Sequence, residues 1–493
     1  MPKHVVIIGG GIAGLCASLR LAHEGYKVTV IEKEQFVGGK IRQIMIGDQG
    51  VDSGPTVFTM SWVFEDLFKK CNENLSDHLQ LTPLPVLARH FWGSDQLDLF
   101  ADQHQSAKAI REFSSNRQAE LFLEFCNMSK KVYESLEGPY IKSKRPSLTS
   151  MMSQLGASGS KNLIAIGLFK SLWDSLEKYF PDPRLHQLFG RYATYCGSSP
   201  YLAPATLMLI AHVEMVGVWS IQNGMVQLPK TIAKLAQDRG AQIQTNTKVV
   251  KIHHQNNLIQ YIETDKGEKI SADSFIFNGD INALQKGLFG DSLTKAVPKI
   301  SPTPSLSALT WSINVPKVNF PLSRHTVFFD QNYKSEFEDI FNQKSLPKTP
   351  TVYLCAQSRI NQEPEGANDK MLLLVNAPPI GERQISNQEI ELCQQQVMRL
   401  LGRSGLELNL NSASVVRTSP TEFNQLFPGT GGALYGMATH GWMSSFARPS
   451  SISNIKNLYL AGGSVHPGPG VPMAAMSGHL AAEALMERQA LIK

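Results

Sequence analysis

Cysteine is scarce in this sequence, and the few cysteines stand far apart. The 493 residues contain six of them, with no CxxC pair and no histidines at the spacing of a zinc site. This distribution argues against a disulfide framework and against a structural zinc ion. We therefore expect no metal site in this chain.

A large excess of charge of one sign is also missing. The 47 lysines and arginines exceed the 42 aspartates and glutamates by five, which is too little for the basic field of a nucleic-acid-binding surface. We expect no nucleic acid among the partners. Hydrophobic residues make up 42% and charged residues 18% of the chain, which indicates a folded protein of two or three domains with large cores.

No long apolar run is present. The longest mostly apolar stretch, 201–219, is interrupted by Pro204, His212 and Glu214, whereas a membrane span needs about 18 clean apolar residues. The chain runs directly into the β-branched stretch 5–8, without the basic and apolar regions of a secretion signal. The sequence therefore predicts a cytoplasmic protein with no transmembrane helix.

The first forty residues predict a βαβ unit. Residues 5–8 and 27–31 are short β-branched runs, and residues 12–22 carry apolar side chains at helical spacing. Gly25 separates the predicted helix from the second strand.

The rest of the chain changes between helical and extended patterns. Residues 106–218 show helical periodicity, mainly at 120–136 and 162–179, and predict a helical insertion. The alternating segments between 306 and 376 predict an antiparallel sheet that carries a substrate on one face. The predicted strands are 241–252, 258–264, 274–278, 306–315, 326–330, 351–357, 371–376 and 458–461, and a last helix spans 471–487.

The turn between the first strand and the first helix has the pattern GxGxxG. Gly9 permits the tight turn, Gly11 lets the backbone approach a pyrophosphate, and Gly14 lets helix and strand pack closely. The phosphates would lie at the helix N-terminus, beside Ile12, where unpaired N–H groups favour anions. Glu32 ends the second strand, where it can accept hydrogen bonds from ribose hydroxyls. Together these residues predict a dinucleotide site.

Two further segments carry a resemblance to a known family. Residues 37–42 read VGGKIR and residues 50–56 read GVDSGPT. With the GGGIAGL run, they resemble the FAD-dependent amine-oxidase and phytoene-desaturase superfamily. The resemblance implies an α/β fold with a Rossmann-like FAD-binding domain and FAD as cofactor, although Gly38-Gly39 would also suit an ordinary hairpin loop. It implies cofactor contacts from Lys33, Gly39, Lys40, Pro55 and Thr56, with the Lys40 charge near the pyrophosphate.

The C-terminal segment 457–476, NLYLAGGSVHPGPGVPMAAM, is similar to the flavin motif of bacterial carotenoid desaturases. A helix N-terminus aimed at the flavin can stabilise negative charge on its ring. His466 is a candidate base in this loop, with a structural role as the alternative. The similarity implies cofactor contacts from Gly463, Gly470, Val471, Pro472 and Met473, and elsewhere from Val249, Asn278 and Leu434, although Val249 and Asn278 would also serve as simple strand residues.

The middle of the chain is most similar to the hydroxycarotenoid 3,4-desaturase branch. The resemblance rests on four segments, 191–200, 219–225, 322–329 and 373–378, although Asn223 stands where the family often has glycine. It implies hydride transfer from a carotenoid to FAD, with the C3–C4 bond of an acyclic, 1-hydroxylated end group as the target, and oxygen or a quinone as electron acceptor. The base for the second proton stays open, with Arg191, His212, Glu214 and His325 as candidates.

Other functions also fit these motifs. A phytoene desaturase, a redox-neutral carotenoid isomerase and a flavin amine oxidase are alternatives, and a non-catalytic flavin or lipid carrier is another. A carotenoid is insoluble in water, so we expect reversible association with a membrane surface, through the apolar, basic-flanked segment 161–173. A helix lining an internal channel or core is the alternative for that segment.

The resemblance also divides the chain into three expected domains. The FAD-binding domain is discontinuous, with residues 1–75, 219–290 and 440–493. A mixed-sheet substrate domain takes residues 76–105 and 291–439, and a helical domain at the membrane and substrate entrance takes residues 106–218.

Overall fold

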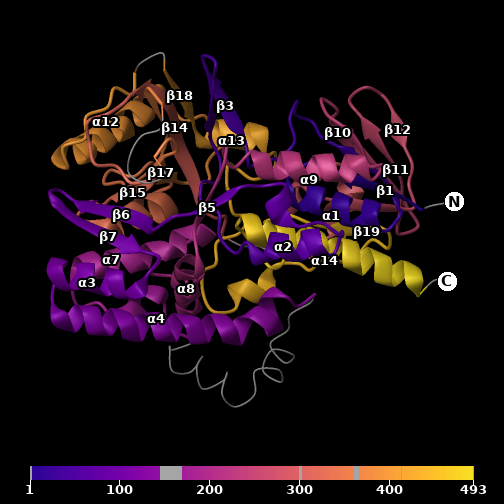
Figure 1. Ribbon diagram of the computed structural model, residues 1–493. Helices are drawn as coiled ribbons and strands as arrows, with labels where there is room; N and C mark the ends of the chain where they lie inside the picture. Colours follow the sequence, from indigo (N-terminus) through magenta and orange to yellow (C-terminus); the bar gives the residue numbers. More distant parts are fainter. Residues whose placement is uncertain (1–2, 145–168, 299–302, 360–365, 412–413, 492–493) are drawn as a thin grey trace.

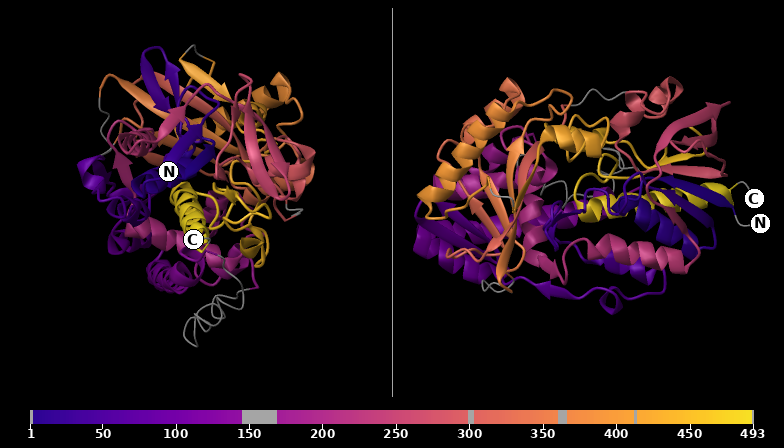
Figure 2. Two further views of the ribbon diagram at one scale, coloured as in Figure 1. Left: turned by 90° about the vertical axis from the view of Figure 1, so that its right-hand side faces the viewer. Right: turned by 90° about the horizontal axis from the view of Figure 1, so that it is seen from above.

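The computed structural model describes residues 3–144, 169–298, 303–359, 366–411 and 414–491. Two sheets lie at opposite ends of the molecule, with a group of helices below one of them (Figure 1). Both termini lie at the same end, beside the first sheet, as the view from above also shows (Figure 2). The fold is therefore an α/β arrangement with two separate sheets, as predicted.

The first sheet has five parallel strands in the order β19-β13-β1-β2-β9. Three of its strands are buried on both faces, which explains their apolar runs VVII, VTVI and SFIF. The first βαβ unit is confirmed. The strands are β1 (His4–Ile8), β2 (Lys27–Ile31), β9 (Gln242–Gln244), β13 (Ser274–Phe277) and β19 (Leu458–Leu460).

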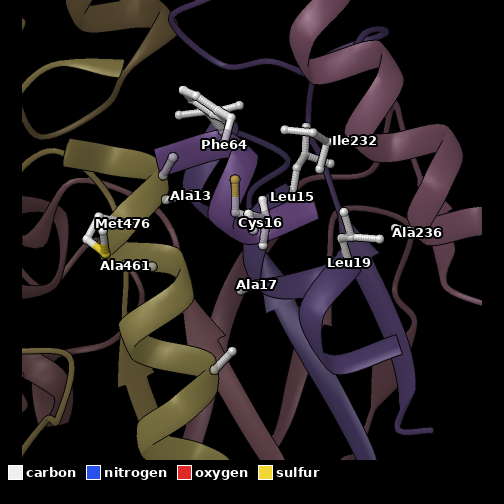
Figure 3. Packing of buried hydrophobic residues seen from close by; sticks show 14 of the residues in the cluster. Ala13, Leu15, Cys16, Ala17, Leu19, Phe64, Ile232, Ala236, Ala461 and Met476 are labelled. Atoms are coloured by element: carbon white, nitrogen blue, oxygen red, sulfur yellow. The ribbon is translucent and has the colours of Figure 1, made fainter. Parts of the chain in front are cut away.

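Three helices pack against each other on this sheet. They are α1 (Ile12–His23), α9 (Gln227–Asp238) and α14 (Val471–Ala490). In Figure 3, Leu15 of α1 lies beside Ile232 of α9 and Leu19 lies beside Ala236, while Met476 of α14 lies on the other side of α1. A Cβ at Gly478 of α14 would lie 2.0 Å from the carbonyl oxygen of Ala13. Only glycine therefore permits the close contact of α14 with α1.

One predicted strand is wrong. Residues 241–252 form two strands in different sheets, because the chain turns between β9 and β10 (Val249–Gln255). Asn246 has φ of +51°, a left-handed conformation that ends a strand. Val249 consequently begins a strand instead of lying within one. The β10 strand pairs with β11 (Leu258–Thr264), which pairs with β12 (Lys269–Ile270).

The second sheet has seven strands in the order β18-β14-β17-β16-β15-β6-β7. The pair β15–β6 is parallel and the others are antiparallel, so the sheet is mixed. Helix α12 (Asn387–Arg403) packs on one face and leaves the other for a ligand. The strands are β6 (Val86–Trp92), β7 (Asp95–Phe100), β14 (Ser307–Pro316), β15 (His325–Phe328), β16 (Val352–Ala356), β17 (Asn368–Ala377) and β18 (Val415–Thr418).

Helices from the middle of the chain lie below the second sheet (Figure 1). The predicted helix 120–136 is confirmed within α4 (Asn116–Leu136), whereas most of 161–173, and the first part of 162–179, fall outside the described residues. No helix in the described ranges is long and apolar enough to cross a membrane. The others in this region are α3 (Gln103–Phe113), α6 (Leu172–Leu176), α7 (Pro183–Gly190) and α8 (Leu209–Val216).

Short elements connect the two sheets. The hairpin of β3 (Gln43–Ile46) and β4 (Gln49–Asp52), closed by Gly47 at φ of +64°, was not predicted. The remaining elements are α2 (Trp62–Lys69), β5 (Leu81–Pro83), β8 (Trp219–Ile221), α10 (Ile281–Gln285), α11 (Tyr333–Phe337) and α13 (Pro420–Leu426). The five-stranded sheet draws all its strands from residues 1–75, 219–290 and 440–493, the ranges predicted for the FAD-binding domain.

Candidate active site

A cavity of about 1250 Å³ runs from the glycine loop after β1 to the open face of the seven-stranded sheet. Single ligand sites usually measure about 300–1,000 Å³, so this cavity has room for a cofactor and a substrate together. Every residue predicted to contact the cofactor lines it except Gly14. The sequence motifs therefore meet in one place, although they come from distant parts of the chain.

Gly14 shapes the cavity without lining it. A Cβ there would lie 2.4 Å from the carbonyl oxygen of Gly9 and 2.6 Å from Nδ2 of Asn278. Asn278 itself donates from Nδ2 to the carbonyl oxygens of Gly9, at 2.9 Å, and Gly11, at 3.3 Å. No side chain caps the N-terminus of α1, so its first N–H groups are available to an anion, which suits a pyrophosphate.

Glu32 lies 6% exposed at the end of β2. Its carboxylate accepts hydrogen bonds from the backbone N–H groups of Gly10, at 2.6 Å, and Glu34, at 2.9 Å. Burial raises the pKa of Glu32, and these two donors oppose the rise. The adjacent Lys33 forms an ion pair with Glu34 at 2.8 Å. Each carboxylate oxygen of Glu32 keeps a lone pair with which it could accept a ribose hydroxyl.

The glycine pair Gly38-Gly39 lies against the glycine loop that follows β1. The N–H of Gly38 donates to the carbonyl oxygen of Gly10 at 2.8 Å, and a Cβ at Gly39 would lie 3.1 Å from Cα of Gly11. The Lys40 ammonium follows and donates to the carbonyl oxygen of Leu434 at 2.6 Å. Burial lowers the pKa of Lys40, and the nearby Asp280 opposes the change.

Arg448 is a cavity residue that the sequence did not reveal. It is 6% exposed and donates to the carbonyl oxygens of Met437, at 2.8 Å, and Gly463, at 3.2 Å. Through these bonds it fixes the loop after β19 against the loop 435–437. A lone arginine in an irregular segment gives no sequence signal.

The C-terminal motif adopts the predicted strand, loop and helix. Helix α14 begins at Val471, and no side chain caps it at Gly470. Its first N–H groups are therefore free to face a ligand in the cavity. His466 does not reach the cavity wall, because it is 1% exposed and Nε2 lies 2.9 Å from the carbonyl oxygen of Ser143. Burial lowers the pKa of His466 to about 4.

The seven-stranded sheet supplies the opposite wall. Thr310, Leu374 and Tyr353 lie side by side on β14, β17 and β16, in one cross-strand row. The Tyr353 hydroxyl lies 2.6 Å from Oγ1 of Thr56, which joins the sheet to the predicted cofactor turn. An apolar wall faces them from the helices and the loop before β19, formed by Leu136, Tyr140, Ile141, Leu207, Leu209, Ile210, Val213, Trp442 and Phe446.

Of the four candidate bases Arg191, His212, Glu214 and His325, the first lines the cavity and the other three do not. The Glu214 carboxylate accepts hydrogen bonds from the hydroxyls of Tyr192, at 2.7 Å, and Tyr195, at 2.5 Å, and burial raises its pKa. Nδ1 of His325 lies 2.7 Å from the Tyr353 hydroxyl, and burial lowers its pKa to about 3. Burial also lowers the pKa of His212.

Comparison with known proteins defines the class. The family described as flavin-containing amine oxidoreductase matches residues 12–486, and the chain belongs to this family. A structure of putrescine oxidase with redesigned cofactor binding has the same fold, with a TM-score of 0.63 at 12% identity over 99% of both chains. The cofactor is therefore FAD, and the glycine cradle, the free helix N-termini and the buried Glu32 fit it.

The particular activity follows from closer relatives. Hydroxyneurosporene desaturase of Rubrivivax gelatinosus is 50% identical over 98% of this chain and 93% of its own length. The 1-hydroxycarotenoid 3,4-desaturase of Flavobacterium sp. is 32% identical over 98% of both. This protein is an FAD-dependent carotenoid desaturase.

Proposed function

We propose that the protein introduces a C3–C4 double bond into an acyclic carotenoid end group that carries a hydroxyl at C1. The activity for which the Flavobacterium relative is named supports this bond and this end group. The observation that carries the proposal is the single cavity, in which an apolar chamber continues from the dinucleotide cradle to the face of a substrate sheet. Bound FAD supplies a hydride acceptor for this reaction.

The chain's own residues would hold, orient and shield the reactants. The glycine loop, Glu32 and the N-termini of α1 and α14 would hold the dinucleotide. Leu374 and the helical wall would exclude water from the reacting carbons, which strengthens every electrostatic interaction there. We propose oxygen or a quinone as the final electron acceptor.

The test is expression in a bacterium that makes a defined 1-hydroxycarotenoid, followed by pigment analysis. We expect a product lighter by two hydrogens and with a polyene longer by one double bond. The same mass with a changed geometry would indicate an isomerase, and conversion of phytoene alone would indicate a phytoene desaturase. Peroxide release that depends on an amine, with the carotenoid unchanged, would indicate an amine oxidase. FAD binding with no turnover of any of these would indicate a carrier.

We also propose that the protein is cytoplasmic and binds a membrane surface reversibly. Several exposed apolar side chains lie near the helical wall of the cavity. Phe169, 77% exposed, contacts Trp442 with ring centroids 5.3 Å apart, and Met443 beside it is 46% exposed. Val216, 59% exposed, ends α8, whose Leu209 lines the cavity. Such side chains can insert into the interface of a bilayer.

We expect the wild-type protein to float with liposomes and the double variant Phe169→Asp, Met443→Asp to stay behind, because two carboxylates would have to enter the interface. Leu392→Asp is the matched control: Leu392 is 52% exposed on α12 of the seven-stranded sheet domain and should leave flotation unchanged. Undiminished binding of the double variant would refute this surface, and no binding by the wild type would refute membrane association.

A further inference from the structure

We propose that Arg191 binds the oxygen of the substrate's end group and thereby fixes which carbon–carbon bond reaches the flavin. This inference rests on the proposed function, because it assigns one contact within the carotenoid site. It makes Arg191 a residue for substrate positioning and specificity, with a hydroxyl as the group that it recognises.

Arg191 brings a permanent charge into the part of the cavity that lies between the helices and the seven-stranded sheet. It begins the turn after α7 and lines the cavity. Its guanidinium carbon lies 5.6 Å from the ring centroid of Tyr195 and 5.4 Å from that of Tyr353. Within the described ranges, no carboxylate lies within 4.0 Å of this guanidinium. A guanidinium stays charged in proteins and carries five N–H donors, so this cation can offer donors to an oxygen-bearing ligand.

The nearest carboxylates are occupied by other partners. Glu214 holds the hydroxyls of Tyr192 and Tyr195. Glu336 is fully buried and accepts hydrogen bonds from Nδ2 of Asn376, at 2.7 Å, and from the N–H of Thr351, at 3.0 Å. The charge of Arg191 acts on both carboxylates from outside ion-pair distance. The protein therefore stabilises this cation without neutralising it.

Asn376 adds an acceptor to the same cavity. Its side-chain NH₂ group is committed to Glu336, which leaves Oδ1 free to accept, and the residue lines the cavity. A hydroxyl needs both kinds of partner, since it accepts through its oxygen and donates through its proton. Arg191 would supply the donor and Asn376 the acceptor, whereas a hydrocarbon end group could bind to neither of them.

The position of Arg191 connects this contact with the reaction. Tyr353 touches Arg191 through its ring and lies 2.6 Å from Thr56 through its hydroxyl. Thr56 is one of the residues predicted to contact the cofactor, and we expect the turn that it forms with Pro55 to face the ribityl or flavin end. In a 1-hydroxylated end group, C3 lies only two bonds from the carbon that carries the hydroxyl. An oxygen held at Arg191 would therefore keep the C3–C4 bond near the flavin.

The test compares two polyenes that differ only in the C1 hydroxyl, with FAD-loaded enzyme. We expect kcat/KM of the wild type to be about 10- to 100-fold higher for the hydroxylated polyene, as for a hydrogen bond to a charged group. Arg191→Met should lose this preference by slowing the hydroxylated polyene alone. Arg191→Lys should keep part of it. Binding without turnover gives a second measurement, the dissociation constants of the two desaturated products from tryptophan quenching. The wild type should bind the hydroxylated product more tightly, Arg191→Met should bind both products equally, and Arg191→Lys should keep part of the difference.

Arg184→Met is the matched control. Arg184 lies on the same helix–turn segment but forms ion pairs with Asp182 and Asp95 at the surface, so its loss should affect both polyenes equally. Product analysis adds a readout that a structural role would not move, because Arg191→Met should desaturate more than one bond. If Arg191→Met loses FAD, the inference is tested by the kcat/KM ratio of the wild type for the two polyenes and by the same ratio for Arg191→Lys. Equal kcat/KM for both polyenes in the wild type would overturn this inference, whereas turnover of neither would overturn the proposed function.

Discussion

Replacing Glu32 by arginine should yield a protein that is purified without FAD. The buried carboxylate accepts the N–H groups of Gly10 and Glu34, and arginine has no acceptor to offer them. The substitution would also place an unpaired cation at a site only 6% exposed, where the glycine loop could no longer keep its shape. We expect FAD affinity to fall by at least about 100-fold, in line with the loss of two hydrogen bonds to a charged group.

The measurement is FAD released per chain after denaturation, together with the dissociation constant on reconstitution. Glu34→Arg is the matched control, because Glu34 is the exposed neighbour whose side chain is 50% accessible. It should bind FAD almost as the wild type does. Normal FAD content in Glu32→Arg would show that this carboxylate does not organise the nucleotide site.

Substituting Leu374 by tryptophan should abolish desaturation while leaving FAD in place. Leu374 occupies the middle of the row between Thr310 and Tyr353 on the cavity wall. A side chain larger by several heavy atoms would fill the space that the substrate needs. Because misplacement by about 1 Å can cost about 100-fold in rate, we expect kcat/KM to fall at least about that far.

The matched variant is Leu374→Met, which roughly conserves side-chain volume and should keep most of the activity. Both variants should carry one FAD per chain and melt near the wild-type temperature. Full turnover by Leu374→Trp would mean that the carotenoid reaches the flavin by another path than along this sheet.

Local patterns account for most of what the sequence predicted. The GxGxxG pattern marks the turn between a strand and a helix. The positions of β1, α1 and the loop between them could therefore be predicted from residues 4–23 alone. The start of α14 at Val471 followed in the same way from the Gly/Pro loop before it. Such motifs are recognisable because the backbone conformation they need permits few residue types.

Contacts across long sequence separations could not be predicted in the same way. Lys40 and Leu434 were each expected near the cofactor, but their hydrogen bond joins positions 394 residues apart. Arg448 lies in none of the motifs, and only the folded chain shows that Arg448 and Asn376 line the same cavity. The break at Asn246 was missed because the alternation of polar and apolar residues continues through it.

The order of strands in the first sheet affects how the protein matures. β1 lies between β2, which follows it within thirty residues, and β13, which begins at Ser274. At about 5–20 residues per second, a ribosome takes tens of seconds to supply β13 and longer to supply β19. Until then, the edge of β1 that will pair with β13 has no partner in the nascent chain and is open to aggregation. We therefore expect nucleotide loading to wait until β13, β19 and the start of α14, which help to form the site, have been synthesised.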